Sequence, residues 1–167
     1  MIGIRDEEPG DAGPIDDLTR AAFSVAAHSS GTEQFIVRAL REAGRLPVSL
    51  VAVQDGDIVG HVAASPVRLD GLDAGWHGLG PVPVRPDRHG QGIGTRLVRQ
   101  ALARLRDSGA AGGVVLGEPG YYGRFGFRAE ARLVLPGVPA GYFQAIAFGG
   151  TVPTGEVAYD PAFEASA

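Results

Sequence analysis

A glycine-rich loop is the part of this sequence whose residue types and spacing most directly suggest chemistry. The loop and the start of the helix that follows it consist of His89, Gly90, Gln91, Gly92, Ile93, Gly94 and Thr95. A helix N-terminus presents unpaired amides and the positive end of the helix dipole, and glycines let an anion approach the backbone. We therefore predict a pyrophosphate site made of backbone amides.

Two common phosphate-binding motifs do not fit this loop. Its spacing is G-x-G-x-G, and Thr95 and Leu97 stand where a dinucleotide-binding loop would need its third glycine. A P-loop needs a lysine, whereas all 15 basic residues of this chain are arginine. The loop thus predicts a ligand other than NAD or ATP. The alternative is a flexible loop with an ordinary helix cap.

Composition excludes several other classes of chemistry. The chain has no cysteine, which rules out thiol nucleophiles, acyl-cysteine intermediates, disulfides and zinc-thiolate sites. It has no lysine for a Schiff base, no Gly-x-Ser-x-Gly elbow and no His-Glu-x-x-His pair, so we expect no metal. A net charge of −4 gives no indication of a nucleic-acid partner.

Two segments resemble the motifs of a known family. The stretch VRPDRHGQGIGTRL, residues 84–97, resembles the acetyl-CoA-binding motif [Gln/Arg]-x-x-Gly-x-[Gly/Ala] of the GNAT superfamily of N-acetyltransferases. The stretch VLGEPGYYGRFGF, residues 115–127, resembles the second cofactor motif of its YhbS-like branch. Two further stretches, residues 50–52 with 59–62 and residues 78–82, are similar to the same branch. The resemblance covers nearly the whole chain. His89 departs from it, because the family usually has Gln or Arg there.

This resemblance implies direct transfer of an acetyl group from acetyl-CoA to a primary amine of a small molecule or peptide, without a metal or a covalent enzyme intermediate. The missing cysteine agrees with direct transfer. The negative net charge favours cationic acceptors. The alternative from another class is an acyl-CoA-binding sensor or regulatory module that binds the cofactor without turnover.

The strand before the loop is expected, by the same resemblance, to bind the pantetheine arm and the thioester. Residues two apart on a strand point their N–H groups to the same side, so Val82 and Val84 keep donors on one edge. Pro81 and Pro83 have no N–H on the other edge. We expect Val82, Pro83 and Val84 to line the cofactor. The alternative is that the prolines merely end a strand.

Tyr122 is the predicted catalytic residue. It occupies the tyrosine position of a Tyr-x-x-x-Gly-Phe pattern, where many GNAT enzymes place a tyrosine near the sulfur of CoA. A phenol is protonated at neutral pH and can donate a proton to a departing thiolate. The alternative is that Tyr121 and Tyr122 pack with Phe125 and Phe127 as an aromatic lid.

The group that takes the proton of the amine is left open by the sequence. Glu33 belongs to a capping-box pattern that begins at Ser30, and His61 lies in an apolar strand. His77 lies on the strand that leads to the cofactor site, and Glu118 follows a later strand. Bulk water is the remaining candidate.

These residues must be positioned by an α+β domain. Apolar periodicity, capping patterns and two Asp-Gly turns predict the order β-α-α-β-β-β-α-β-α-β-β, with a mixed central sheet flanked by helices. The predicted strands cover residues 2–5, 48–53, 58–69, 74–84, 114–116, 143–148 and 156–159, and the main helices residues 11–26, 30–44 and 93–109. We expect one domain over residues 1–167.

A cytoplasmic location is expected. The first residues do not show a basic stretch followed by an apolar stretch, so they do not resemble a signal peptide. The longest uncharged run, residues 133–155, contains prolines and glycines that suit strands and turns better than a membrane-spanning helix. Oligomeric state is not predicted by the sequence.

Overall fold

The computed structural model describes residues 1–26 and 29–166 and divides into two compact units. Unit 1 consists of Met1–Ala64, Gly80–Ala101 and Pro161–Ala167, and unit 2 of Ser65–Leu79 and Leu102–Asp160. Strand β3 (Asp57–Leu69) and helix α3 (Ile93–Asp107) each contribute residues to both units. The expectation that residues 1–167 act as one domain stays a prediction.

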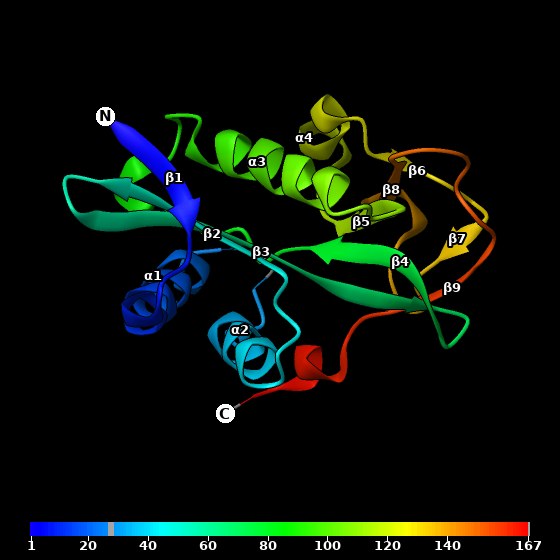
Figure 1. Cartoon of the computed structure of the whole chain (residues 1–167), viewed down its shortest axis with the longest axis horizontal. Helices are drawn as coiled ribbons and strands as arrows, with labels where there is room; N and C mark the ends of the chain where they lie inside the picture. The colour runs from blue at the N-terminus through cyan, green and yellow to red at the C-terminus, as the bar shows by residue number, and fades with distance from the viewer. Residues whose placement is uncertain (27–28, 167) are drawn as a thin grey trace. The chain divides into compact units, whose positions relative to one another are not determined.

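Three antiparallel strands form the sheet of unit 1, in the order β1 (Ile2–Asp6), β2 (Val48–Gln54), β3 (Figure 1). β2 and β3 are joined at the predicted Asp-Gly turn, where Asp55 and Gly56 have φ of 53° and 83°. Positive φ at both central residues gives a turn whose twist matches that of the flanking strands.

Helices cover both faces of this sheet (Figure 1). On one face, α1 (Ala12–Ser24) and α2 (Glu33–Glu42) bury Ile15 and Val37 against Val51. On the other face α3 lies so close that a Cβ added to Gly60 would be 2.9 Å from side-chain atoms of both Ile93 and Leu97. The glycine therefore sets how closely the start of α3 approaches β3.

Unit 2 contains a mixed sheet. β4 runs parallel to β5, β5 runs antiparallel to β8, and β8 runs antiparallel to β6. β9 pairs with the end of β3 and with β7. The elements of this unit are β4 (Leu72–Leu79), β5 (Gly112–Leu116), α4 (Pro119–Tyr122), β6 (Arg128–Ala129), β7 (Leu133–Val134), β8 (Phe143–Ala147) and β9 (Gly155–Ala158).

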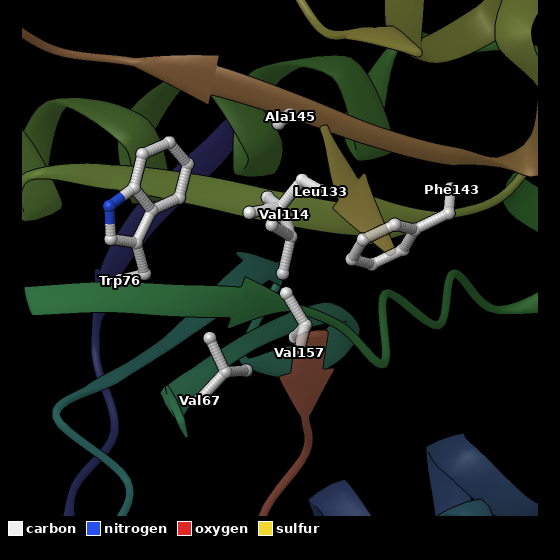
Figure 2. Close-up of a cluster of buried hydrophobic side chains, with 7 residues drawn as sticks. All are labelled: Val67, Trp76, Val114, Leu133, Phe143, Ala145 and Val157. Carbon is white, nitrogen blue, oxygen red and sulfur yellow. The ribbon is translucent and has the colours of Figure 1, made fainter. Parts of the chain in front are cut away.

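The hydrophobic core of unit 2 is built around Val114 of β5. In Figure 2, Val114 lies between the rings of Trp76 and Phe143 and is faced by Val67 and Val157. The buried residues of this core cluster are Val67, Trp76, Val114, Leu133, Phe143, Ala145 and Val157. The core therefore joins strands that are up to 90 residues apart in sequence.

The predicted α+β class and mixed sheet are confirmed, and the predicted order of elements holds from β1 to α4. The structure then adds β6 and β7, which are two residues long and too short to show an alternating pattern. β4 ends at Leu79, before the predicted boundary, because Gly80 (φ 123°) leaves the extended conformation. Among the described residues, no helix has the length and apolarity needed to cross a membrane.

Candidate active site

A short 3-10 turn, Pro86–Arg88, holds the beginning of the glycine-rich loop. The Asp87 carboxylate accepts hydrogen bonds from Arg85 Nε at 2.7 Å and from Arg88 Nη1 at 3.0 Å. Arg88 Nε also donates to Gln54 Oε1 at the end of β2, at 2.8 Å. The exposed ion pairs of Asp87 add little stability and act within the turn, whereas the Arg88–Gln54 hydrogen bond attaches the turn to the sheet.

The loop itself has the backbone that the sequence predicts for an anion site. Gly90 and Gly92 have φ of 81° and 77°, and α3 begins directly afterwards at Ile93. The first hydrogen bond of the helix runs from the amide of Arg96 to the carbonyl of Gly92 at 3.1 Å. The amides of Ile93 and Gly94 therefore lie ahead of the first hydrogen bond of the helix. A Cβ at Gly90 or Gly92 would meet nothing within 4 Å. The glycines are thus needed for conformation rather than for space.

The segment before the loop lies along β3 with a defined orientation. The carbonyls of Pro81 and Pro83 accept hydrogen bonds from the amides of Ala63 and His61, at 3.2 and 3.0 Å. Alternation along the segment turns the amides of Val82 and Val84 to the opposite edge. In the described part of the chain, neither of these two amides donates a hydrogen bond. That Val82, Pro83 and Val84 line a cofactor stays a prediction.

His89 is anchored to the same segment. Its Nε2 lies 3.0 Å from the carbonyl oxygen of Val84, so an N–H at this position donates to that carbonyl. The backbone amide of His89 donates to the carbonyl of Pro86 at 3.5 Å. Because this amide is already used, the loop amides after His89 are the more available donors. The exposed ring therefore connects the strand edge to the glycine-rich loop.

Tyr122 lies in unit 2 at the end of α4, among aromatic rings. The ring centroid of Tyr122 is 5.0 Å from that of Tyr121 and 6.0 Å from that of Phe127. A side chain at Gly117 would collide with the Tyr122 ring, so the ring covers the end of β5. Burial raises the pKa of Tyr122 to about 12, which keeps the phenol protonated. Packing and proton donation are both compatible with this position.

His61, one of the four candidate bases, is fully buried in a hydrogen-bond network. Ser49 Oγ donates to Glu7 Oε1 at 2.7 Å and lies 2.8 Å from His61 Nε2, so Nε2 carries the hydrogen and donates to Ser49. Arg41 pairs with Glu7 through two hydrogen bonds of 2.7 and 2.8 Å. Burial lowers the pKa of His61 to about 4. The ring is a neutral core group.

Glu33 is used at the start of α2. Its carboxylate accepts from Ser29 Oγ at 2.9 Å and from the amide of Ser30 at 3.2 Å. Of the two hydrogen bonds of the predicted capping box, only the one from the Ser30 amide to the Glu33 carboxylate forms. The helix begins after Thr32, and the Ser30 hydroxyl lies 2.6 Å from Thr32 Oγ1 instead of bonding to the Glu33 amide. Glu33 therefore has a structural role here.

His77 and Glu118 are the remaining candidates. Glu118 is exposed and precedes α4. His77 is half-buried, and its Nδ1 finds no hydrogen-bond partner among the described residues. Burial lowers the pKa of His77, with the backbone of Gly75 acting in the opposite direction. No group of His, Asp and Glu within residues 1–26 and 29–166 is arranged to hold a metal ion.

The sequence did not indicate the Glu7–Arg41–Ser49–His61 network. Its members come from the segment after β1, from α2, from β2 and from β3, and no local pattern connects them. Burial raises the pKa of Glu7, but the hydrogen bonds from Arg41 and Ser49 outweigh this effect and hold the pKa below its ordinary value. Each of these residues resembles an ordinary surface or strand residue when read alone.

Comparison with known proteins gives close relatives. The chain is 43% identical over 130 residues to YhbS of Escherichia coli K12, named an uncharacterized N-acetyltransferase, and this region covers 77% of the chain and 75% of YhbS. It is 49% identical to a solved GNAT family acetyltransferase of Brucella melitensis in complex with acetyl-CoA, with a TM-score of 0.89, covering 98% of this chain and 99% of that one.

The E. coli YhbS structure in complex with CoA has a TM-score of 0.88 and 38% identity, and covers 97% of this chain and 91% of that one. Residues 14–127 match the Acetyltransferase (GNAT) family. This match spans both segments that carried the resemblance in the sequence, the loop at residues 84–97 and the Tyr122 motif at residues 115–127. The chain belongs to the GNAT family of acetyltransferases.

Proposed function

We propose that this chain transfers the acetyl group of acetyl-CoA directly to a primary amine. The observation that carries the proposal is a strand edge with two unused amides, Val82 and Val84, that leads into a glycine-rich loop at the start of α3. Relatives from Brucella melitensis and E. coli are solved with acetyl-CoA and CoA. We further propose a cytoplasmic location and a small-molecule or peptide acceptor.

Cofactor binding is assigned to backbone groups. Amides between Gly90 and Thr95 hold the pyrophosphate, since they lie at a helix N-terminus whose dipole favours negative charge. The amides of Val82 and Val84 bind the pantetheine arm and the thioester. Gln91, Ile93 and His89 contribute backbone around the loop, and the His89 ring keeps the carbonyl of Val84 engaged.

Transfer requires a C–N bond to form as the C–S bond breaks. An amide of the Val82–Val84 edge donates to the thioester oxygen as negative charge develops on it, a contribution worth about 10²–10³ in rate. The phenol of Tyr122 donates to the departing thiolate. Its raised pKa keeps the phenol protonated until negative charge develops on sulfur. The proton of the amine passes to His77 or to water.

The direct test follows free thiol release from acetyl-CoA with a panel of amines, together with calorimetric binding of acetyl-CoA. We expect binding of one cofactor per chain and amine-dependent thiol release. Binding without release on any amine would favour the non-catalytic acyl-CoA sensor. Absence of binding would contradict the proposal altogether.

A further inference from the structure

A cavity of about 340 Å³ lies in unit 2, and neither motif points to it. It is formed by β7, the beginning of β8 and the loops before and between them. The lining residues are Ala129, Glu130, Ala131, Leu133, Val134, Leu135, Val138, Ala140, Gly141 and Phe143. A cavity of roughly 150 Å³ is enough for benzene, so this one has room for an aromatic ring with an alkyl arm.

The lining of the cavity is mostly apolar. Leu133 and Phe143 of the wall belong to the buried core cluster of unit 2, and Leu135 and Val138 pack against that cluster. Val134 of the lining is 49% exposed. Small-molecule sites are concave and lined mostly by apolar side chains, with a few polar groups that orient the ligand. A ligand with a hydrocarbon body would cover these apolar side chains.

Glu130 is the one ionisable side chain of the lining. Its Oε2 forms an ion pair with Nη2 of Arg132, which is not a lining residue, and the 3.7 Å separation is longer than a hydrogen bond, so the carboxylate keeps acceptor capacity toward a ligand. A carboxylate beside an apolar cavity disfavours a ligand that carries a carboxylate of its own. The cavity therefore suits a hydrocarbon attached to a cationic group.

The cavity and Tyr122 are both placed by the end of β5 in unit 2. Phe143 of the wall pairs with Leu116 at the end of β5, and the amide of the next residue, Gly117, donates to the carbonyl of Tyr142 at 2.9 Å. The ring of Tyr122 covers Gly117. The cavity wall and the side chain to which we assign proton donation thus lie at the same end of β5.

We propose that this cavity binds the hydrocarbon substituent of the acceptor, and that the acceptor is a primary amine with an aromatic or alkyl group and no carboxylate. The proposal rests on the proposed function, because it places the amine of that reaction. Polyamines lack the hydrocarbon end group, and amino acids bring a carboxylate toward Glu130.

The test uses three matched amines with the full chain and acetyl-CoA: 2-phenylethylamine, phenylalanine, which adds a carboxylate to the same skeleton, and putrescine, which lacks the ring. Because burial of its ring in the cavity is favourable, we expect 2-phenylethylamine to have a kcat/KM at least about 10-fold above those of the other two amines. Equal values for the three amines would overturn the cavity proposal while leaving the proposed function intact.

Cavity-filling variants give a readout independent of turnover. Ala140→Trp fills the cavity from an exposed lining position, and Ala103→Trp introduces the same side chain on the exposed face of α3. We expect Ala140→Trp to raise the calorimetric Kd of 2-phenylethylamine at least about 10-fold, with acetyl-CoA affinity unchanged, and Ala103→Trp to change neither. If Ala140→Trp does not fold, Ala131→Trp fills the same cavity.

Charge is tested in the same way. Glu130→Gln should raise the relative kcat/KM for phenylalanine, whereas Glu156→Gln on the exposed side of β9 should not.

Unchanged binding of 2-phenylethylamine to both filled variants would overturn the proposal. So would a loss of butyryl-CoA use in place of amine binding, which would assign the cavity to the acyl chain of the donor. Cavity binding of 2-phenylethylamine without acetylation of any amine would instead contradict the proposed function.

Discussion

At the residue scale, neighbouring tyrosines of α4 allow the chemical role of one to be separated from packing. Tyr121 and Tyr122 share an edge-to-face contact, and only Tyr122 covers the end of β5 at Gly117. A hydroxyl can be removed from either residue while its ring stays in place. The pair is therefore a built-in control for the assignment of proton donation.

We expect Tyr122→Phe to keep the affinity for acetyl-CoA and to lower kcat by about 10²–10⁴, because it removes a general acid and preserves the ring. Tyr121→Phe should leave kcat near that of the parent. Steady-state kinetics with a good amine acceptor checks both variants. Parent-like turnover of Tyr122→Phe would mean that Tyr122 serves only as part of an aromatic lid.

At the scale of elements, the start of α3 is defined by a backbone conformation. Gly92 has φ of 77° and open space around its Cα, and Gly44, which follows α2, has φ of 69° and the same open surroundings. An alanine at either position is strained by about 1–2 kcal/mol without any steric clash. Their difference is that only Gly92 immediately precedes the helix N-terminus proposed to bind pyrophosphate.

We expect Gly92→Ala and Gly44→Ala to lower the free energy of unfolding by similar amounts, about 1–2 kcal/mol. Only Gly92→Ala should weaken acetyl-CoA binding, because relaxation of the strained residue turns the amides at the start of α3 away from the pyrophosphate. Calorimetric titration of both variants, after denaturant unfolding curves, gives the comparison. Equal acetyl-CoA affinities would remove the loop from the cofactor site.

At the scale of the whole molecule, buried ionisable groups make stability depend on pH. His61 titrates at about 4 in the folded chain and near 6.5 when unfolded, so the unfolded state binds more protons between these values. The pKa of His77 is also lowered by burial, and its contribution has the same sign. Glu7 and Asp11, whose pKa values are held low by Arg41 and Arg5, add a loss of stability at more acidic pH.

We expect the free energy of unfolding to be nearly constant above pH 7 and to fall by about 3 kcal/mol from His61 alone as pH is lowered from 6.5 to 4. His61→Leu should flatten this slope, whatever its effect on stability at pH 7. Urea unfolding at a series of pH values measures the slope. A slope unchanged by His61→Leu would show that His61 does not stay neutral in the folded chain.

Contiguous features were predictable from the sequence alone. The Asp55-Gly56 turn, the glycine-rich loop before α3 and the two motifs that carried the family resemblance each lie within a short stretch. Their conformations follow from local backbone preferences, such as the access of glycine to positive φ. The same holds for the alternation that turns the amides of Val82 and Val84 to one edge, because it depends only on strand geometry and on the prolines beside them.

Tertiary structure decided what depends on residues that are distant in sequence. Glu7 and His61 are linked through Ser49 only because β2 pairs with β3, and that burial makes His61 a neutral core residue rather than a base. The cavity near Glu130 exists because Leu133 and Phe143 pack on a core supplied by other strands. Burial and cavity volume are properties of the space between elements. No pattern within a single element contains them, because their free energy comes from packing across the chain.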